Sequence, residues 1–342
     1  MKALVLEAYN RLEYREVAEP AIGPNDVLVN VKACGICGSD VYGLDGSTGR
    51  RIPPVIMGHE AAGIVAEVGC QVRGWQAGER VTFDSNIYCG VCRYCRKGMI
   101  NLCDRRRVLG VSCAEFRQDG AFAEYVAVPQ QGVYRLPDGL SFEHAALVEP
   151  VSIAVHAAGR PTIKLNDSAV VVGAGMIGLL LVQALRAAGC RHIVALDLEP
   201  NRLDLACQLG ANVGLRADAP DVVNQVLEHQ DGGADLVFEA VGTAAALQLA
   251  FECARKGGEL TLIGNVSPTA VLPLQRVVIR ELTLYGSCQS TGEYPACLDM
   301  MARGAIKVDS LISAVAPLAE GSAWFEKLRQ RSMGLLKVIL IP

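Results

Sequence analysis

The chain has 342 residues, of which 51% are hydrophobic and 20% are charged, and its formal net charge is −4. This length favours two domains over one core, and the weakly acidic balance does not favour a nucleic-acid or membrane-surface partner. The N-terminal residues lack the apolar stretch of a secretory signal, and the most apolar run, residues 169–182, is too short to span a bilayer as a helix. We therefore expect a cytoplasmic protein.

The first 150 residues predict a β-rich domain. Gly and Pro interrupt short apolar runs, and residues 26–32 alternate apolar and polar side chains, which is typical of a strand with one buried face. We place the first part of this domain at residues 1–152.

Four cysteines lie close together within this domain: Cys89, Cys92, Cys95 and Cys103. Their spacing can bring four thiolates around one ion, which makes a closed tetrahedral site typical of structural zinc. An iron–sulfur cluster is one alternative, but the fourth cysteine of bacterial ferredoxins follows after three residues and precedes proline, whereas here seven residues intervene and Asp104 follows. A nucleic-acid-binding zinc ribbon is the other alternative, and it does not suit a long acidic chain. The remaining cysteines have no tight spacing, and we interpret them as small apolar residues.

From about Thr162 the pattern changes to alternating strands and helices. Strand-like runs occupy residues 169–172, 193–196, 236–238 and 260–263, and helix-like stretches occupy residues 177–188, 201–209 and 244–254. This alternation predicts a doubly wound parallel sheet with helices on both faces. We place this α/β domain at residues 153–285, and expect residues 286–342 to return to the first domain and end in a strand over 337–341.

The first strand of the α/β domain leads into a glycine motif that is typical of dinucleotide binding. Gly173 permits a tight turn, Gly175 lets the backbone approach a pyrophosphate, and Gly178 allows a helix to pack closely on the strand. Met176 and Ile177 begin the helix, whose free N–H groups favour phosphate. Because glycine-rich turns also arise from packing alone, the motif needs support from elsewhere in the sequence.

Asp197 gives that support, because it ends the next strand, 19 residues beyond Gly178. A carboxylate there accepts hydrogen bonds from the adenosine ribose hydroxyls and repels the 2′-phosphate of NADP, which favours NAD. The alternative is a solvated residue at a strand end. Arg202 is placed to lie beside the ribose or a phosphate, although an ordinary solvated helix charge explains it equally well.

Residues 58–63 read Gly-His-Glu-Ala-Ala-Gly and are followed by Gly69, which resembles the signature of zinc-containing medium-chain alcohol dehydrogenases. The Cys-Gly-Ser-Asp run at 37–40, the four cysteines and the glycine motif keep that family's order, and the resemblance covers essentially the whole chain. Residues 149–152, Glu-Pro-Val-Ser, with His156 downstream are similar to sorbitol and other polyol dehydrogenases, including galactitol-phosphate enzymes. The resemblance implies a β-rich GroES-like catalytic domain and a Rossmann cofactor domain.

The resemblance also implies roles for particular residues. Cys37 and His59 would bind a catalytic zinc, and Ser39 would take the substrate proton toward the cofactor ribose. Glu60 and Glu149 are the candidates for a further carboxylate ligand, one of them directly and the other through water. Because neighbours in an extended segment point to opposite sides, we expect Glu149 to lie within zinc contact or one water of it, with Glu60 sharing the site.

Two positions depart from the family pattern. Many relatives have a histidine five residues after the zinc cysteine as the end of the proton relay, whereas this chain has Tyr42, which would redirect the proton or contact the substrate. Gln289 stands where sorbitol-type enzymes have an arginine that touches the polyol. The sequence therefore leaves the identity of the polyol open.

Taken with the residues, the resemblance implies an NAD-dependent dehydrogenase with two zinc ions per chain, one catalytic and one structural. It would transfer a hydride from a secondary hydroxyl of a polyol or sugar-like alcohol to NAD, and L-threonine, butanediol and phosphorylated polyols remain alternative substrates. A non-catalytic binding protein on the same fold is disfavoured, because it need not keep the cysteine, histidine, serine and carboxylate together. We expect a small-molecule alcohol substrate and a homo-oligomer, either a dimer or a tetramer.

Overall fold

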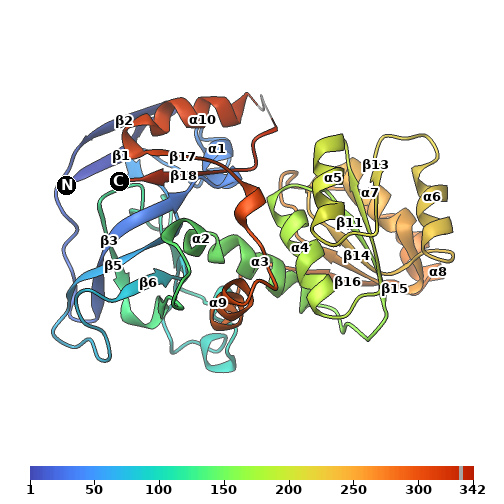
Figure 1. Ribbon diagram of the computed structural model, residues 1–342, viewed down its shortest axis with the longest axis horizontal. Coiled ribbons are helices and arrows are strands. Elements are labelled where there is room, and N and C mark those ends of the chain that lie inside the picture. The colour runs from blue at the N-terminus through green and yellow to red at the C-terminus, as the bar shows by residue number, and fades with distance from the viewer. Residues whose placement is uncertain (331–333) are drawn as a thin grey trace. The chain divides into compact units, whose positions relative to one another are not determined.

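The computed structural model describes residues 1–330 and 334–342, which divide into two compact units (Figure 1). Unit 1 comprises Met1–Glu149, Tyr294–Arg303 and Val308–Pro342, and unit 2 comprises Pro150–Glu293 and Gly304–Lys307. The sequence placed the return to the first domain at residue 286, whereas residues 286–293 stay with unit 2. They stay there because β16 (Thr283–Gly286) extends the sheet of that unit, and because Glu293 pairs with His156 at 2.7 Å.

Unit 1 is β-rich, as the sequence predicted, and its strands form three sheets. The largest sheet has the order β10 (Val133–Arg135), β6 (Arg80–Phe83), β5 (Glu60–Val68), β3 (Asp26–Gly35), β18 (Lys337–Ile341) and β17 (Ile312–Pro317), and β9 (Tyr125–Pro129) also pairs with β3. A second sheet has the order β2 (Arg11–Glu16), β1 (Lys2–Ala8) and β4 (Val55–Ile56). The pair β7 (Asn86–Ile87) and β8 (Arg107–Val108) frames the segment that carries the four cysteines.

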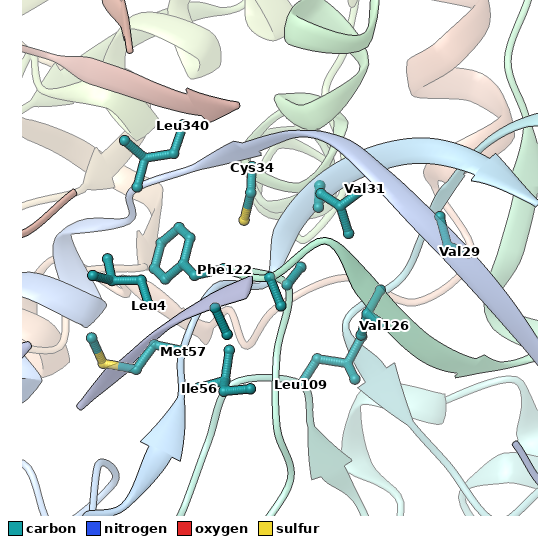
Figure 2. Packing of buried hydrophobic residues seen from close by; sticks show 14 of the residues in the cluster. Leu4, Val29, Val31, Cys34, Ile56, Met57, Leu109, Phe122, Val126 and Leu340 are labelled. Carbon is teal, nitrogen blue, oxygen red and sulfur yellow. The ribbon is translucent and has the colours of Figure 1, made fainter. Parts of the chain in front are cut away.

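The core of unit 1 lies between these strands. Figure 2 shows how buried side chains from distant parts of the sequence point toward one another, among them Leu4, Met57, Phe122 and Leu340. The ring of Phe122 meets that of Phe325 edge to face at 5.7 Å, which anchors α10 (Gly321–Arg329) on the core. The C-terminal strand is therefore part of the packed centre of this unit.

Short helices complete unit 1, and one of them carries candidate site residues. These helices are α1 (Gly38–Gly43), α2 (Phe142–Ala146), α9 (Tyr294–Ala302) and α10. Cys37 is the N-cap of α1, and the Asp40 side chain reaches back to the Cys37 backbone N–H. This reciprocal capping satisfies backbone donors that a helix start leaves free, so the turn is fixed by its own sequence.

Unit 2 contains the predicted parallel sheet, and the prediction of its fold class is confirmed. The six strands have the order β13 (Val213–Arg216), β12 (His192–Asp197), β11 (Ser168–Val172), β14 (Ala234–Glu239), β15 (Ala254–Leu262) and β16, and every pairing is parallel. All residues of β11 are buried, as expected for a central strand covered on both faces.

Helices connect and cover these strands (Figure 1). They are α3 (Val148–Ala158, whose first two residues belong to unit 1), α4 (Met176–Ala187), α5 (Pro200–Gln208), α6 (Val222–His229), α7 (Ala244–Cys253) and α8 (Leu274–Ile279). Helix α4 packs on β11 and β12, α5 on β12 and β13, and α7 on β11, β14 and β15. The alternation of strand and helix puts the glycine motif at the C-terminal end of β11, where ligands bind in open parallel sheets.

None of the helices in the described ranges is long and apolar enough to cross a lipid bilayer.

Candidate functional site

The four clustered cysteines converge in the structure. One sulfur from each of Cys89, Cys92, Cys95 and Cys103 lies within 4.8 Å of the others, and none of the four is in a disulfide. Two short 3₁₀ turns, Cys95–Lys97 and Ile100–Leu102, fold this segment. Four sulfur donors at this separation fit a closed tetrahedral zinc site.

Backbone N–H groups surround these sulfurs. The N–H of Cys89 and that of Arg105 donate to Cys103 Sγ at 3.3 and 3.4 Å. Hydrogen bonds from the backbone of Val91 and Cys92 lower the pKa of Cys89 to about 6. Backbone hydrogen bonds also lower the pKa of Cys92, whereas burial and the neighbouring thiols raise that of Cys95 to about 12. The backbone therefore favours the thiolate, the form that binds a metal, at Cys89 and Cys92.

A second group of metal-binding atoms forms in unit 1 from Cys37, His59 and Glu60. One ligand atom from each lies within 4.8 Å of the others, and His59 and Glu60 are buried. Strict alternation along a strand would send neighbouring side chains to opposite sides. It does not apply here, because β5 begins only at Glu60 and His59 precedes it. A sulfur, an imidazole and a carboxylate form a donor set that suits zinc.

Asp40 lies behind His59. Its Oδ1 atom is 3.5 Å from Nδ1 of His59 and accepts a hydrogen bond from Nη2 of Arg51 at 2.8 Å. Burial acts to raise the pKa of Asp40, but the charges of His59 and Arg51 outweigh it and hold the pKa well below its usual range. A carboxylate beside Nδ1 favours the form of the ring that leaves Nε2 for a metal.

Glu60 is paired with Lys337. The Nζ atom of Lys337 lies 2.8 and 2.5 Å from the two carboxylate oxygens of Glu60 and donates to the Ile36 carbonyl at 3.0 Å. Both side chains are almost fully buried, with Glu60 1% and Lys337 2% exposed. Gly35 leaves room for the pair, since a Cβ there would lie 2.4 Å from Glu60 Oε2.

Glu149 lies in the first turn of α3 and is buried as well. Burial raises the pKa of its carboxyl to about 7, the charge of Glu60 acts in the same direction, and His59 and Lys337 act against it. Glu149 is therefore electrostatically coupled to the Cys37–His59–Glu60 group, although it is not one of the three residues whose ligand atoms lie together.

Ser39 and Tyr42 both lie on α1, beside Cys37. Ser39 is exposed, and its Oγ atom accepts a hydrogen bond from Arg51 Nη2 at 3.5 Å. Tyr42 is 49% exposed. Gln289, the other departure from the family pattern, lies in the unit 2 loop between β16 and α9, with φ at 53°.

The glycine motif of unit 2 has the geometry that its sequence predicted. Gly173 has φ at 99°, which favours glycine, and Gly175 is the N-cap of α4. A Cβ on Gly178 would lie 1.8 Å from the Gly173 carbonyl, so only glycine allows this close packing. Met176 and Ile177 form the first turn of α4, whose backbone N–H groups are available to a phosphate.

Asp197 ends β12 beside this motif. Its Oδ2 atom accepts a hydrogen bond from the Ala174 N–H at 2.7 Å, and its Oδ1 atom accepts one from the Glu199 N–H at 3.0 Å. The carboxylate is thus fixed against the glycine loop. Arg202 Nη1 lies 4.0 Å from Asp197 Oδ1, so both residues belong to the same end of the sheet.

Comparison with known proteins agrees with this combination of a sulfur- and histidine-lined site and a dinucleotide fold. Residues 23–138 match the model of the alcohol dehydrogenase GroES-like domain, and residues 177–303 match the zinc-binding dehydrogenase model. The chain belongs to the zinc-binding alcohol dehydrogenase family and is an oxidoreductase.

Individual relatives cover the whole length. The chain is 33% identical to the sorbitol dehydrogenase of Bacillus subtilis (strain 168), with 100% of this chain and 97% of the relative covered. It is 33% identical to the D-arabitol-phosphate dehydrogenase of Enterococcus avium, with 94% and 92% covered. Among solved structures, alcohol dehydrogenase TADH from Thermus sp. ATN1 has 33% identity and a TM-score of 0.94, with 100% and 99% covered.

The sequence predicted no role at the metal site for Asp40, Arg51 or Lys337. In the sequence Asp40 is only part of the run at 37–40, and Arg51 stands with Arg50 and Arg117 only as a cation that could hold a phosphate or carboxylate. Asp40 had a local signal, because an acidic residue three positions after an N-cap forms a capping box. Lys337 had a weaker one, a single cation at the start of an apolar strand. Arg51 resembled an ordinary surface cation, and no spacing rule connects it to residue 40.

Proposed function

We propose that the chain oxidises a secondary hydroxyl of a polyol or sugar-like alcohol and passes the hydride to NAD. The convergence of Cys37, His59 and Glu60, with Glu149 buried and coupled to them, is the observation that carries this proposal. The family resemblance places Glu149 where typical alcohol dehydrogenases have a cysteine ligand. A carboxylate in that place makes a harder, more electrophilic site, suited to a substrate with neighbouring hydroxyl groups.

Two zinc ions per chain fit the residues present. Cys89, Cys92, Cys95 and Cys103 would hold the structural ion, and Cys37, His59 and a carboxylate from Glu60 or Glu149 would hold the catalytic ion. When bound at the second group, zinc would supply Lewis-acid chemistry that lowers the pKa of a substrate hydroxyl. Asp40 would help to orient the His59 ring, and the Ser39 hydroxyl would accept the substrate proton while passing its own proton on toward the cofactor ribose.

The position of Lys337 distinguishes Glu60 from Glu149 as candidate metal ligands. Both oxygens of Glu60 contact its Nζ atom, so the charge of Glu60 is already compensated by a cation. Burial of Glu149 disfavours its charged form and raises the pKa of its carboxyl to about 7. We infer that a metal ion would stabilise the buried Glu149 carboxylate, directly or through one water, and that Glu60 shares the site.

The proposed cofactor is NAD, held by the first turn of α4 and by Asp197. A fixed carboxylate at the end of β12 repels a 2′-phosphate. A relative described as a zinc-binding dehydrogenase, from Sinorhizobium meliloti 1021, was solved with NADP; it is 34% identical with a TM-score of 0.92 and covers 100% of this chain and 99% of its own. Because a relative binds NADP, family membership alone does not decide between NAD and NADP. The proposed preference of this chain for NAD rests on Asp197 at the end of β12.

Substrates with a phosphate group are a second candidate, because one relative is an arabitol-phosphate dehydrogenase. Arg51, the arginine that contacts Ser39 and Asp40, does not support a phosphate-bearing substrate. It is buried and paired with Asp40 instead of being exposed to a ligand. We therefore favour an unphosphorylated polyol, and L-threonine and butanediol remain in the test panel.

We further propose that the chain forms a homo-oligomer. Helix α8 buries none of its residues, and Leu274, Val278 and Ile279 are more than half exposed on it. The neighbouring strand β16 is the last in its sheet. An exposed apolar patch beside a sheet edge suits contact with a second copy. The cytoplasmic location stays a prediction.

A screen of NAD reduction tests the function. Polyols, sugar acids, threonine, butanediol and polyol phosphates are compared, each with and without a metal chelator. We expect the fastest reduction with an unphosphorylated polyol, loss of that activity with chelator, and loss by orders of magnitude in the Glu149→Ala variant with NAD binding retained. Equal activity with chelator, or a fully active Glu149→Ala variant, would contradict the proposal.

A further inference from the structure

Arg51 is a buried arginine whose charge faces the interior of unit 1. Its side chain is 3% exposed, and the backbone around it is held by a bridge to Ser112, whose carbonyl accepts from the Ile52 N–H at 2.8 Å. Gly43 makes room for the side chain, because a Cβ at that position would lie 2.4 Å from Arg51 Cγ. A long cation is thus accommodated by specific neighbours and does not merely lie on the surface.

The guanidinium of Arg51 contacts two consecutive residues of α1 through one nitrogen. Its Nη2 atom donates to Asp40 Oδ1 at 2.8 Å and to Ser39 Oγ at 3.5 Å, and its Nη1 atom donates to the Arg50 carbonyl at 3.0 Å. The planar group therefore spans the carboxylate and the hydroxyl at a fixed separation.

Asp40 extends this connection to two of the proposed metal ligands. Its Oδ1 atom is 3.5 Å from His59 Nδ1, and its Oδ2 atom accepts from the Cys37 N–H at 3.3 Å. A carboxylate that is fully buried needs a cation or several donors to remain in place. Within the described ranges, Arg51 is the permanent cation among the groups that contact Asp40.

We propose that Arg51 is a positioning residue with two separable effects: through Asp40 it holds His59 and Cys37 in the geometry that binds the catalytic metal, and through Ser39 it orients the hydroxyl that receives the substrate proton. This inference rests on the proposed function for its second effect. The first effect depends only on metal binding at Cys37 and His59.

The two effects are separated by two substitutions. Arg51→Gln removes the charge and leaves Asp40 buried without a permanent cation, so both effects should be lost. Arg51→Lys keeps a charge for Asp40 but loses the planar donor group that also reaches Ser39. Arg50→Gln is the matched control, because Arg50 is the adjacent arginine and is exposed.

Zinc affinity tests the first effect without any turnover. Each variant is titrated against a chromogenic chelator, and the same variant carrying Cys37→Ala supplies the blank in which the four-cysteine site remains. We expect Arg51→Gln to weaken the catalytic site by about 10- to 100-fold, as for other residues that orient metal ligands. Arg51→Lys and Arg50→Gln should stay within about threefold of the native chain.

A double-mutant cycle with Ser39→Ala tests the second effect. We expect Arg51→Lys to lower kcat for alcohol oxidation by about tenfold in the native background and to have no further effect when Ser39 is alanine, since contacting residues are not additive. The substrate KM should change less than kcat. Circular dichroism and the melting temperature show whether Arg51→Gln folds. If it does not fold, the cycle with Arg51→Lys still tests the role of Arg51 through Ser39.

The outcomes separate this inference from the proposed function. A catalytic zinc affinity unchanged in Arg51→Gln, or effects of Arg51→Lys and Ser39→Ala that multiply independently, would overturn the role of Arg51. A native chain that binds zinc at Cys37 but oxidises no alcohol with NAD would instead overturn the proposed function, and the zinc titration would still test the link through Asp40.

Discussion

The residues around Cys37 and His59 include an unusual number of buried charges: Asp40, Arg51, Glu60, Glu149 and Lys337. Each buried charge loses its hydration, so each needs a partner in the protein or a bound ion. Four of these five charges form two ion pairs, Asp40–Arg51 and Glu60–Lys337. At the scale of residues, the site therefore contains paired buried charges. Removal of one partner leaves the other charge buried without a counter-charge, which destabilises the folded protein.

Lys337→Met is the first prediction at this scale. It leaves the Glu60 carboxylate buried without its cation, and removal of one partner from a buried pair costs about 3–5 kcal/mol. We expect the free energy of unfolding from denaturant titration to fall by that amount, and to recover in large part when Glu60→Gln is added. Lys256→Met, at an exposed lysine, is the control. Equal losses in the single and double variants would show that the pair is not what stabilises this region.

The second residue-scale prediction concerns the cofactor. Asp197→Ser removes the carboxylate that faces the glycine loop, so repulsion of a 2′-phosphate disappears. We expect the ratio of kcat/KM for NAD to that for NADP to fall toward one or invert, while both values drop because the Ala174 N–H loses its acceptor. Asp204→Ser changes the same charge at an exposed position on α5 and should leave the ratio unchanged. A native chain that uses both cofactors equally would contradict the role of Asp197.

The sequence predicted the residues that would bind the metal or the dinucleotide themselves. It missed the residues whose role is to pair with those side chains. Cysteine, histidine and glycine at family spacings identify the metal and dinucleotide residues. The cations that support them have no such spacing: Lys337 is 277 positions from Glu60 and 301 from Ile36. Only the pairing of β18 with β3, and of β3 with β5, brings them together.

At the scale of elements, the segment between β7 and β8 depends on its four sulfurs for its fold. It contains only two 3₁₀ turns and few buried apolar side chains, so it has little packing of its own. Structural zinc supplies about 10 kcal/mol or more in small zinc-binding peptides. The metal would therefore be the main source of order in this segment.

Cys92→Ser should remove one zinc per chain and lower the melting temperature. Metal analysis and calorimetry measure the two effects on the same sample. Cys207→Ser, at an exposed cysteine on α5, is the control and should change neither. Full zinc content and unchanged melting in Cys92→Ser would refute a structural site, and visible absorption typical of iron–thiolate bonds would indicate iron–sulfur instead.

In unit 2, Asp235 ties three strands together at their starts. Its Oδ2 atom accepts from the N–H and the hydroxyl of Ser168 on β11, at 2.8 and 2.7 Å, and its Oδ1 atom accepts from Arg255 Nε on β15 at 2.7 Å. Burial acts to raise the pKa of Asp235, but these hydrogen bonds and the charge of Arg255 outweigh it and lower the pKa. The contribution to stability is therefore present above the unfolded-state pKa of about 4 and is lost as pH falls through the lower folded-state pKa.

Asp235→Asn should lower the unfolding free energy by about 1–2 kcal/mol at pH 7, because it removes charge-assisted hydrogen bonds. The difference from the native chain should shrink as the pH falls below about 4. Denaturant titrations at pH 7 and pH 3 measure this. Asp218→Asn, in an exposed pair with Arg216, should have a small effect at both pH values. A difference that is equal at both pH values would contradict the account.

Elements of unit 2 were predicted more completely than those of unit 1. Its buried parallel strands read as continuous apolar runs between amphipathic helices, so β11, β12 and β14 and helices α4, α5 and α7 were predicted to within a few residues. Unit 1 is built mostly from antiparallel strands, and several of its pairs join segments far apart in the sequence, such as β3 with β18. Such pairing depends on the tertiary core and not on local periodicity.

At the scale of the whole molecule, we propose a dehydrogenase with two functional parts. A metal held by Cys37 and His59 acts on an alcohol, and unit 2 binds NAD. Family membership establishes an oxidoreductase.

The most direct measurement combines zinc analysis with NADH formation from a polyol, on the native chain and on Cys37→Ser prepared in parallel. The account predicts two zinc ions per native chain and one in the variant, with NADH formation reduced by orders of magnitude and the melting temperature nearly unchanged, because the four-cysteine site is intact. A Cys37→Ser variant that keeps two zinc ions per chain, or that forms NADH at the native rate, would contradict it.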